Sequence, residues 1–187
     1  MRILTFCSHG KSLLLTESKF LQMLTMRSFA QYPPSSPLLH KAVARMNYLH
    51  APYVKSGKIS NQDLLYVLWA SMFEPVRFMK LYEWRALTNM ETAAIATMWK
   101  HIGTLMGINY AAELGQDQWT NGLDFLDQLT VWAHRYEDQY MLPSPEVEQL
   151  GKILFELLLT SYPNFVRPLG YQIALVLLGD RLRHAFR

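Results

Sequence analysis

The chain has 187 residues, of which 50% are hydrophobic and 18% are charged, so it is long enough to bury a core and too apolar for a disordered chain. The net charge of +3 comes from scattered residues with no Lys/Arg run longer than two, which argues against a nucleic-acid partner. The single cysteine, Cys7, excludes an internal disulfide and a cysteine-based zinc site. No window of 18 uncharged apolar residues predicts a transmembrane helix, and the first residues lack a clear signal-peptide pattern.

The first half of the chain shows helical periodicity interrupted by prolines. A helix is predicted around 17–29, followed by the rigid loop YPPSSP at 32–37. The next helix, 38–50, is expected to end at about His50, because Pro52 disfavours helix at the residue before it. The turn KSGK follows, with Gly57 available for a positive φ.

Two capping patterns mark the helices of the middle region. Ser60 with Asp63 predicts one helix start, and Thr88 with Glu91 predicts a second. The first of these helices is expected to kink or end near Pro75, and the second to stop at Gly107.

Three further helices are predicted in the C-terminal part. Apolar residues at steps of three or four predict a long helix over 119–140. Ser144 and Pro145 suit the N-cap and first turn of the next helix, and a last helix is expected over 168–185. No alternating run predicts a strand, so the predicted fold class is all-α, a single-domain bundle of about six helices.

One histidine shares the apolar face of its predicted helix. Leu39, Val43, Met46 and His50 fall within roughly 60° of one another on a helical wheel. Such a residue is either a core histidine hydrogen-bonded to a neighbour or a ligand to a metal or haem iron. The spacing leaves both interpretations open.

Other catalytic patterns are absent from the sequence. There is no phosphate-binding glycine loop, GxSxG elbow or HExxH motif, and no two histidines stand three or four apart. His101, His134 and His184 are interpreted as boundary or surface histidines. Four charged residues surround Pro75 and predict either a salt-bridge network at a helix end or charges that face a site: Glu74, Arg77, Glu83 and Arg85.

A haem site requires few polar residues: an axial imidazole and one or two cations for the propionates. It also requires an apolar slot between helices. His50, the Met- and aromatic-rich helix faces, and Arg45 or Arg77 satisfy this requirement. Many all-α domains would satisfy it too.

Three segments give a more specific signal: ARMNYLHAPYVKSGKISNQDLLYVL, FEPVRFMKLYEWRALTNME and MWKHIGTLMGI. Together with RPLGYQIALVLLGDRLRHAF near the end, they resemble the fungal branch of a family of haem oxygenases. That family unites the farnesyl-cleaving mpaB-type oxygenase of mycophenolic acid synthesis with the bacterial latex-clearing rubber oxygenases. The similarity runs from about Ser28 to Phe186 and is far weaker to the rubber enzymes.

The resemblance implies an all-helical domain that binds haem b and cleaves a carbon–carbon double bond of an isoprenoid or similar apolar chain with dioxygen. The arginine-to-histidine motif of the family falls on Arg45 and His50. It implies that His50 holds the haem iron and that Arg45 contributes polarity at the propionates or on the oxygen side, with Arg77 as a further cofactor-binding residue. Roles are not assigned to Asp63, Tyr66, Glu74, Glu83 and Arg85.

The first 27 residues do not resemble the family, so we expect a divergent segment, 1–27, followed by an mpaB-like and rubber-oxygenase-like helical domain, 28–187. Fungal members usually begin with a membrane anchor and more helix, which implies an endomembrane location, and the chain is then a short or truncated form. If the haem pocket needs the missing helix, the protein is instead a non-catalytic helical remnant that binds a hydrophobic ligand or partner.

Overall fold

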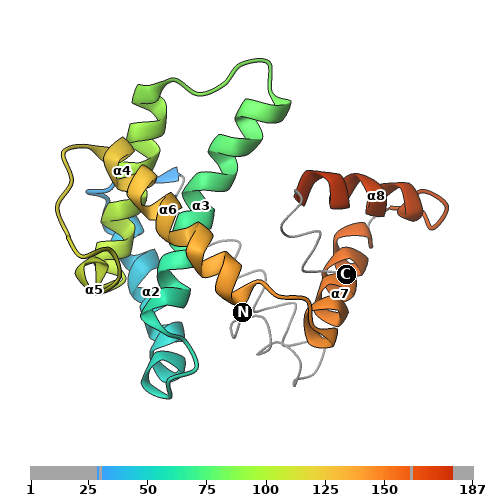
Figure 1. Ribbon diagram of the computed structural model, residues 1–187, viewed down its shortest axis with the longest axis horizontal. Coiled ribbons are helices and arrows are strands. Elements are labelled where there is room, and N and C mark those ends of the chain that lie inside the picture. The colour runs from blue at the N-terminus through green and yellow to red at the C-terminus, as the bar shows by residue number, and fades with distance from the viewer. Residues whose placement is uncertain (1–28, 30, 161, 179–187) are drawn as a thin grey trace. The chain divides into compact units, whose positions relative to one another are not determined.

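Seven helices and no strand make up the regular structure of residues 31–160 and 162–178, which, with residue 29, are the part of the chain described by the computed structural model (Figure 1). The all-α fold class is therefore confirmed for these residues. The predicted helix at 17–29 and the boundary at residue 27 lie outside them, apart from Phe29. None of the described helices combines the length and hydropathy that a bilayer-spanning segment needs.

The helices belong to two compact units, one within residues 9–134 and the other containing residues 135–187. The first unit holds α2 (Pro37–Lys55), α3 (Asn61–Tyr82), α4 (Asn89–Leu105), α5 (Tyr110–Leu114) and most of α6 (Gly122–Tyr140). The second holds the end of α6, α7 (Pro145–Leu159) and α8 (Arg167–Leu178).

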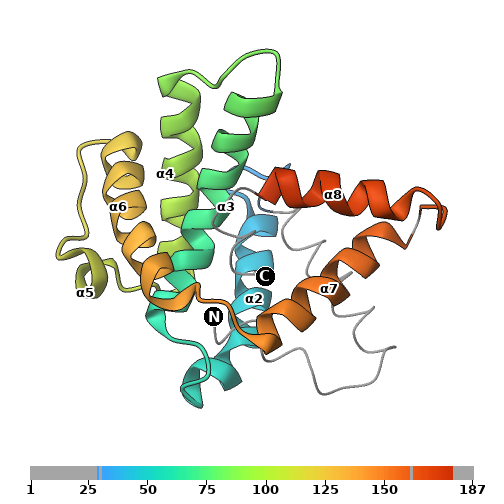
Figure 2. The ribbon, with the colours of Figure 1, turned by 45° about the vertical axis from the view of Figure 1, so that its right-hand side comes forward.

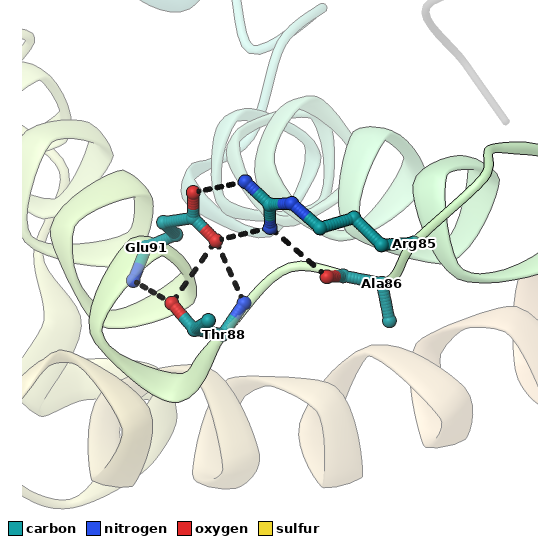
Figure 3. A network of polar contacts seen from close by, with 4 residues as sticks. All are labelled: Arg85, Ala86, Thr88 and Glu91. Atoms are coloured by element: carbon teal, nitrogen blue, oxygen red, sulfur yellow. Dashed lines mark hydrogen bonds and ion pairs between the residues drawn. The ribbon is translucent and has the colours of Figure 1, made fainter.

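Helices α3 and α4 form a hairpin joined by residues 83–88, and both views show them side by side (Figures 1 and 2). Each starts with the predicted capping box. Ser60 Oγ accepts a hydrogen bond from the backbone N–H of Asp63, whose carboxylate accepts one from the Ser60 N–H at 2.8 Å. Thr88 and Glu91 repeat the arrangement at the start of α4 (Figure 3). Local cap chemistry therefore fixes where both helices begin.

A close approach holds the hairpin against α5. Gly103 of α4 is buried, and a Cβ there would clash with the Tyr110 hydroxyl and lie 2.7 Å from a methyl carbon of Leu68. The Tyr110 hydroxyl donates to the Lys100 carbonyl at 2.9 Å, so this buried polar group is satisfied. The larger core lies around these residues and draws its buried side chains from α3, α4, α5, α6 and the connection between α4 and α5: Leu65, Leu68, Trp69, Met72, Ala96, Ile108, Tyr110, Phe125, Leu126, Leu129 and Ala133.

Helix α2 packs on α4 through a second, smaller core. Its members are Phe29, Leu39, Val43, Met46 and Ile102. The predicted stripe of α2 is thus confirmed as its buried face. Asn47 Nδ2 donates to the Leu105 carbonyl at 2.9 Å, which satisfies a carbonyl in the last turn of α4.

The segment between α4 and α6 differs from its prediction. The predicted long helix begins at Gly122 and not at Trp119, because Asn121 caps it by accepting from the N–H groups of Leu123 and Asp124. Trp119 precedes the helix and donates through Nε1 to Gln128 of α6. The five-residue helix α5 was not predicted.

In the second unit, α7 begins at Pro145 as predicted. It packs on α8, where Phe155 and Tyr171 lie with ring centroids 4.7 Å apart and Gly170 leaves room for Leu159. The start of α8 at Arg167 agrees with the prediction, and residues 179–187 lie outside the described part of the chain.

Candidate functional site

The candidate site is built on α2, whose start is set by local chemistry. Ser36 caps the helix by accepting from the Leu38 N–H at 3.2 Å, and Pro37 occupies the first turn. With the helix phase fixed in this way, His50 follows the buried Met46 by one turn on the same face.

The expected end of this helix at His50 is wrong. Helix α2 continues through Pro52 to Lys55, and the chain then turns at Gly57, whose φ is 69°. Pro52 removes one backbone donor, but the N–H of Ser56 still bonds to the Pro52 carbonyl at 3.1 Å. His50 therefore lies inside the helix and not at its end. The unpaired carbonyl groups and the negative end of the helix dipole are at Lys55, beyond His50.

His50 has an unsatisfied nitrogen. Its ring is half-buried, and its Nδ1 atom is buried without a hydrogen-bond partner among the described residues. Burial lowers the pKa of the imidazole, because removal of water disfavours the charged form. A neutral imidazole with an unpaired nitrogen is the form that binds a metal ion or haem iron.

Arg45 points away from His50. Five residues along a helix correspond to a rotation of roughly 140°, so the two side chains leave α2 on different faces. Arg45 is exposed, and its guanidinium lies 5.4 Å from the ring centroid of Tyr48. The structure therefore puts both motif residues on one helix without bringing them together.

Arg77 lies on another helix, sixteen residues after the start of α3 at Asn61, a rise of about 24 Å along its axis. Its guanidinium pairs with Glu74 at 2.6 Å. This ion pair, with the adjacent Tyr82, raises the pKa of Arg77. No contact in the described structure connects Arg77 to His50, so its role as a cofactor-binding residue stays a prediction.

The segment around Pro75 is helical, so the predicted end of the helix near Glu74 is wrong, while the alternative of a kink stays a prediction. Helix α3 runs through Pro75 to Tyr82. Its charges form separate pairs, since Arg77 bonds to Glu74 whereas Arg85 bonds to Glu91 in the next helix. Glu83 is exposed and provides the C-cap position of α3.

Two other histidines meet on α2 and α4. The rings of His40 and His101 lie edge to face with centroids 6.3 Å apart, and His101 Nε2 is buried without a hydrogen-bond partner in the described structure. No local pattern in the sequence predicts this pair, because its members come from different helices. Within the described residues, no three His, Cys, Asp or Glu side chains form a group that could hold a metal ion.

His134 lies at the boundary of the core and not on the surface. Its ring is half-buried and packs edge to face against Trp69 and Phe73. These contacts explain the residue as part of the core of the first unit.

Asp63, whose role was not assigned, receives a structural explanation together with its neighbour Asn61. Asp63 is buried and completes the capping box of α3. Asn61 donates to the Asn109 carbonyl and accepts from the Asn109 N–H at 2.9 Å, which ties the start of α3 to the start of α5. The ISNxD part of the sequence motif therefore builds the fold.

Comparison with curated proteins shows what the chain is similar to. It is 37% identical over 155 residues to ER-bound oxygenase mpaB′ of Penicillium brevicompactum, covering 81% of the chain and 36% of the relative. It is 35% identical over 153 residues to ER-bound oxygenase mpaB of Penicillium roqueforti (strain FM164), covering 81% and 51%. The chain is a relative of the mpaB oxygenases.

The mpaB resemblance inferred from the sequence motifs is thereby confirmed. A further mpaB, from Penicillium brevicompactum, is 40% identical over 116 residues, covering 60% of the chain and 29% of that protein. The chain thus spans about a third to a half of the length of the mpaB proteins it matches. No family model and no solved structure matches the chain.

Proposed function

We propose that the chain is the histidine-bearing part of a haem-dependent oxygenase that cleaves a carbon–carbon double bond in an isoprenoid or similar apolar chain. The observation that carries this proposal is the buried, unpartnered Nδ1 of His50 on the helix that matches the family motif. The relatives named as oxygenases support the reaction class.

Two features of α2 support haem binding. His50 is held in its neutral form by burial, and Met46, one turn away, is buried in the apolar contact between α2 and α4. Haem b would supply an iron that activates dioxygen for scission of the double bond.

The chain would supply a ligand and a dry surface. His50 would donate a ring nitrogen lone pair, and the apolar side chains of the α2–α4 contact would exclude water beside it. Arg45 suits contact with a haem propionate, or a role on the oxygen side, better than Arg77 does. The Arg45 guanidinium is exposed and forms no ion pair among the described contacts, whereas the Arg77 guanidinium is paired with Glu74.

We also propose an endomembrane location. The relatives are named as bound to the endoplasmic reticulum, and the resemblance covers most of this chain. Fractionation of cells that express the tagged chain tests this assignment.

The absorbance spectrum of the purified protein tests the haem. We expect a Soret band that is lost in His50→Ala and retained in His40→Ala, the matched change of an exposed histidine on the same helix. Both variants should keep the helical circular dichroism of the wild type. A Soret band that survives His50→Ala contradicts the ligand role.

A colourless protein with intact helical structure, even after reconstitution with haem, would favour a non-catalytic helical domain that binds a hydrophobic ligand. A haem-loaded protein should consume dioxygen with an isoprenoid substrate and yield carbonyl products. Haem binding without such products would restrict the proposal to the cofactor.

A further inference from the structure

The end of the α3–α4 hairpin exposes a group of large apolar side chains. We define the hairpin tip as Phe78, Leu81, Tyr82, Trp84 and Met90. Trp84 is 87% exposed and Met90 is 80% exposed, whereas soluble proteins seldom leave several such side chains together in water. Both views place the connection between α3 and α4 at one end of the pair (Figures 1 and 2).

The exposed tryptophan is held in place. The Arg85 guanidinium lies 5.4 Å from the Trp84 ring centroid and also donates two hydrogen bonds to the Glu91 carboxylate, each of 2.8 Å (Figure 3). Glu91 is itself fixed by the capping box of α4. The Arg85 contact therefore favours one position of the Trp84 ring before anything binds it, which lowers the entropy cost of binding.

Aromatic contact also orders the α3 side of the tip. Phe78 and Tyr82 stand one turn apart with ring centroids separated by 4.7 Å. Lys80 lies on the same turn and is exposed, so its ammonium group can reach outward. Trp, Tyr and Lys next to aliphatic residues form the composition typical of the membrane–water interface.

Area and charge argue against a protein partner. At their observed exposures, the five side chains present roughly 600 Å² in all, less than the ~800 Å² per partner of a stable protein interface. Residues 74–91, which include the tip, carry three acidic and three basic side chains, so this stretch has no net charge with which to select a charged partner. A small apolar tip of this kind is better suited to a lipid surface, whose molecules can rearrange around it.

We propose that the hairpin tip inserts into the interfacial layer of a phospholipid bilayer. Trp84 and Met90 enter the boundary between headgroups and acyl chains, while Lys80 and Arg85 stay at the headgroup level. Binding then depends on buried apolar area and needs no anionic lipid. The proposal does not depend on haem binding by the chain.

Vesicle flotation with the full chain tests this proposal. We expect the wild type to float with phosphatidylcholine vesicles and a Trp84→Ser/Met90→Ser double variant to lose roughly tenfold or more in partition coefficient. The matched control is Leu38→Ser/Val131→Ser, which removes two exposed apolar side chains away from the tip and should change partition less than about twofold. Adding phosphatidylserine should change wild-type binding by a similarly small factor.

Several outcomes would overturn the proposal: no flotation of the wild type, unchanged flotation of the tip variant, or an equal loss in the control variant. A wild-type dimer in sedimentation that the tip variant abolishes, without vesicle binding, would assign the tip to a second copy instead. The single variant Leu81→Ser supplies an independent check and should show a smaller loss in the same direction. Because all these positions are exposed, circular dichroism should match the wild type for every variant.

Discussion

Two adjacent parts of one sequence motif have opposite physical character. In the cap segment, residues 57–63, Ser60 and Asp63 satisfy each other and Asn61 is bonded to α5. In the preceding helical stretch, residues 45–50, His50 keeps a buried nitrogen without a partner. One sequence motif can therefore contain both residues that determine the fold and residues that are available for chemistry.

Among the variants that test this comparison, Asp63→Ala should change the free energy of unfolding the most. The change removes the carboxylate that accepts from the Ser60 N–H and Oγ, and leaves a partly buried donor unpaired. We expect a loss of about 2 kcal/mol in the free energy of unfolding, measured by urea denaturation. Asp127→Ala, at an exposed position in α6, should change it by less than about 0.5 kcal/mol. Equal effects of both variants would remove the distinction drawn for the cap segment.

His50→Leu should have the opposite sign. In haem-free protein the substitution removes an unsatisfied buried nitrogen and keeps a similar volume, so we expect a gain on the order of 1 kcal/mol. Urea denaturation at neutral pH measures it. A loss as large as that of Asp63→Ala would show that His50 is a structural residue.

The pH dependence of stability sharpens the same point. Since burial lowers the pKa of His50, the unfolded chain binds a proton more readily than the folded chain. The stability contributed by neutral His50 is present above its unfolded pKa of about 6.5 and is lost as the pH falls through that value toward the folded pKa. His50→Leu should therefore flatten the decline of stability as the pH falls through about 6.5.

The smallest expected effect concerns the cap of α4. Arg85, then the N–H and hydroxyl of Thr88, lower the pKa of Glu91 to about 2. Arg85→Ala should raise this pKa part of the way to 4.5, because the Thr88 bonds remain. A carboxyl-carbon NMR titration measures the change. An unchanged pKa would show that the capping box alone accounts for it.

Helix starts could be predicted from the sequence because cap chemistry is local. Ser60 with Asp63, Thr88 with Glu91, and Ser144 before Pro145 each involve residues close in the chain, and all three helix starts are confirmed. The stops expected at Pro52 and Pro75 were wrong, since a proline removes a single donor that the rest of the helix can tolerate.

The candidate site was less predictable for a physical reason. The inward phase of His50 follows from the apolar stripe of α2, and its half-buried position agrees with it. The meeting of His40 with His101 depends on how α2 crosses α4, which no local spacing encodes. The Glu74–Arg77 ion pair, by contrast, joins residues three apart in α3, a spacing that the sequence does show.

The short connection between α3 and α4 also bears on how the chain acquires its structure. Only residues 83–88 separate the two helices, so closing this loop costs little entropy and the hairpin contacts form between segments near in sequence. During synthesis, α3 and α4 precede α7 and α8 and therefore leave the ribosome first. The tip with Trp84 at its end would then be exposed on the nascent chain from an early stage, so contact with a lipid surface could begin during translation.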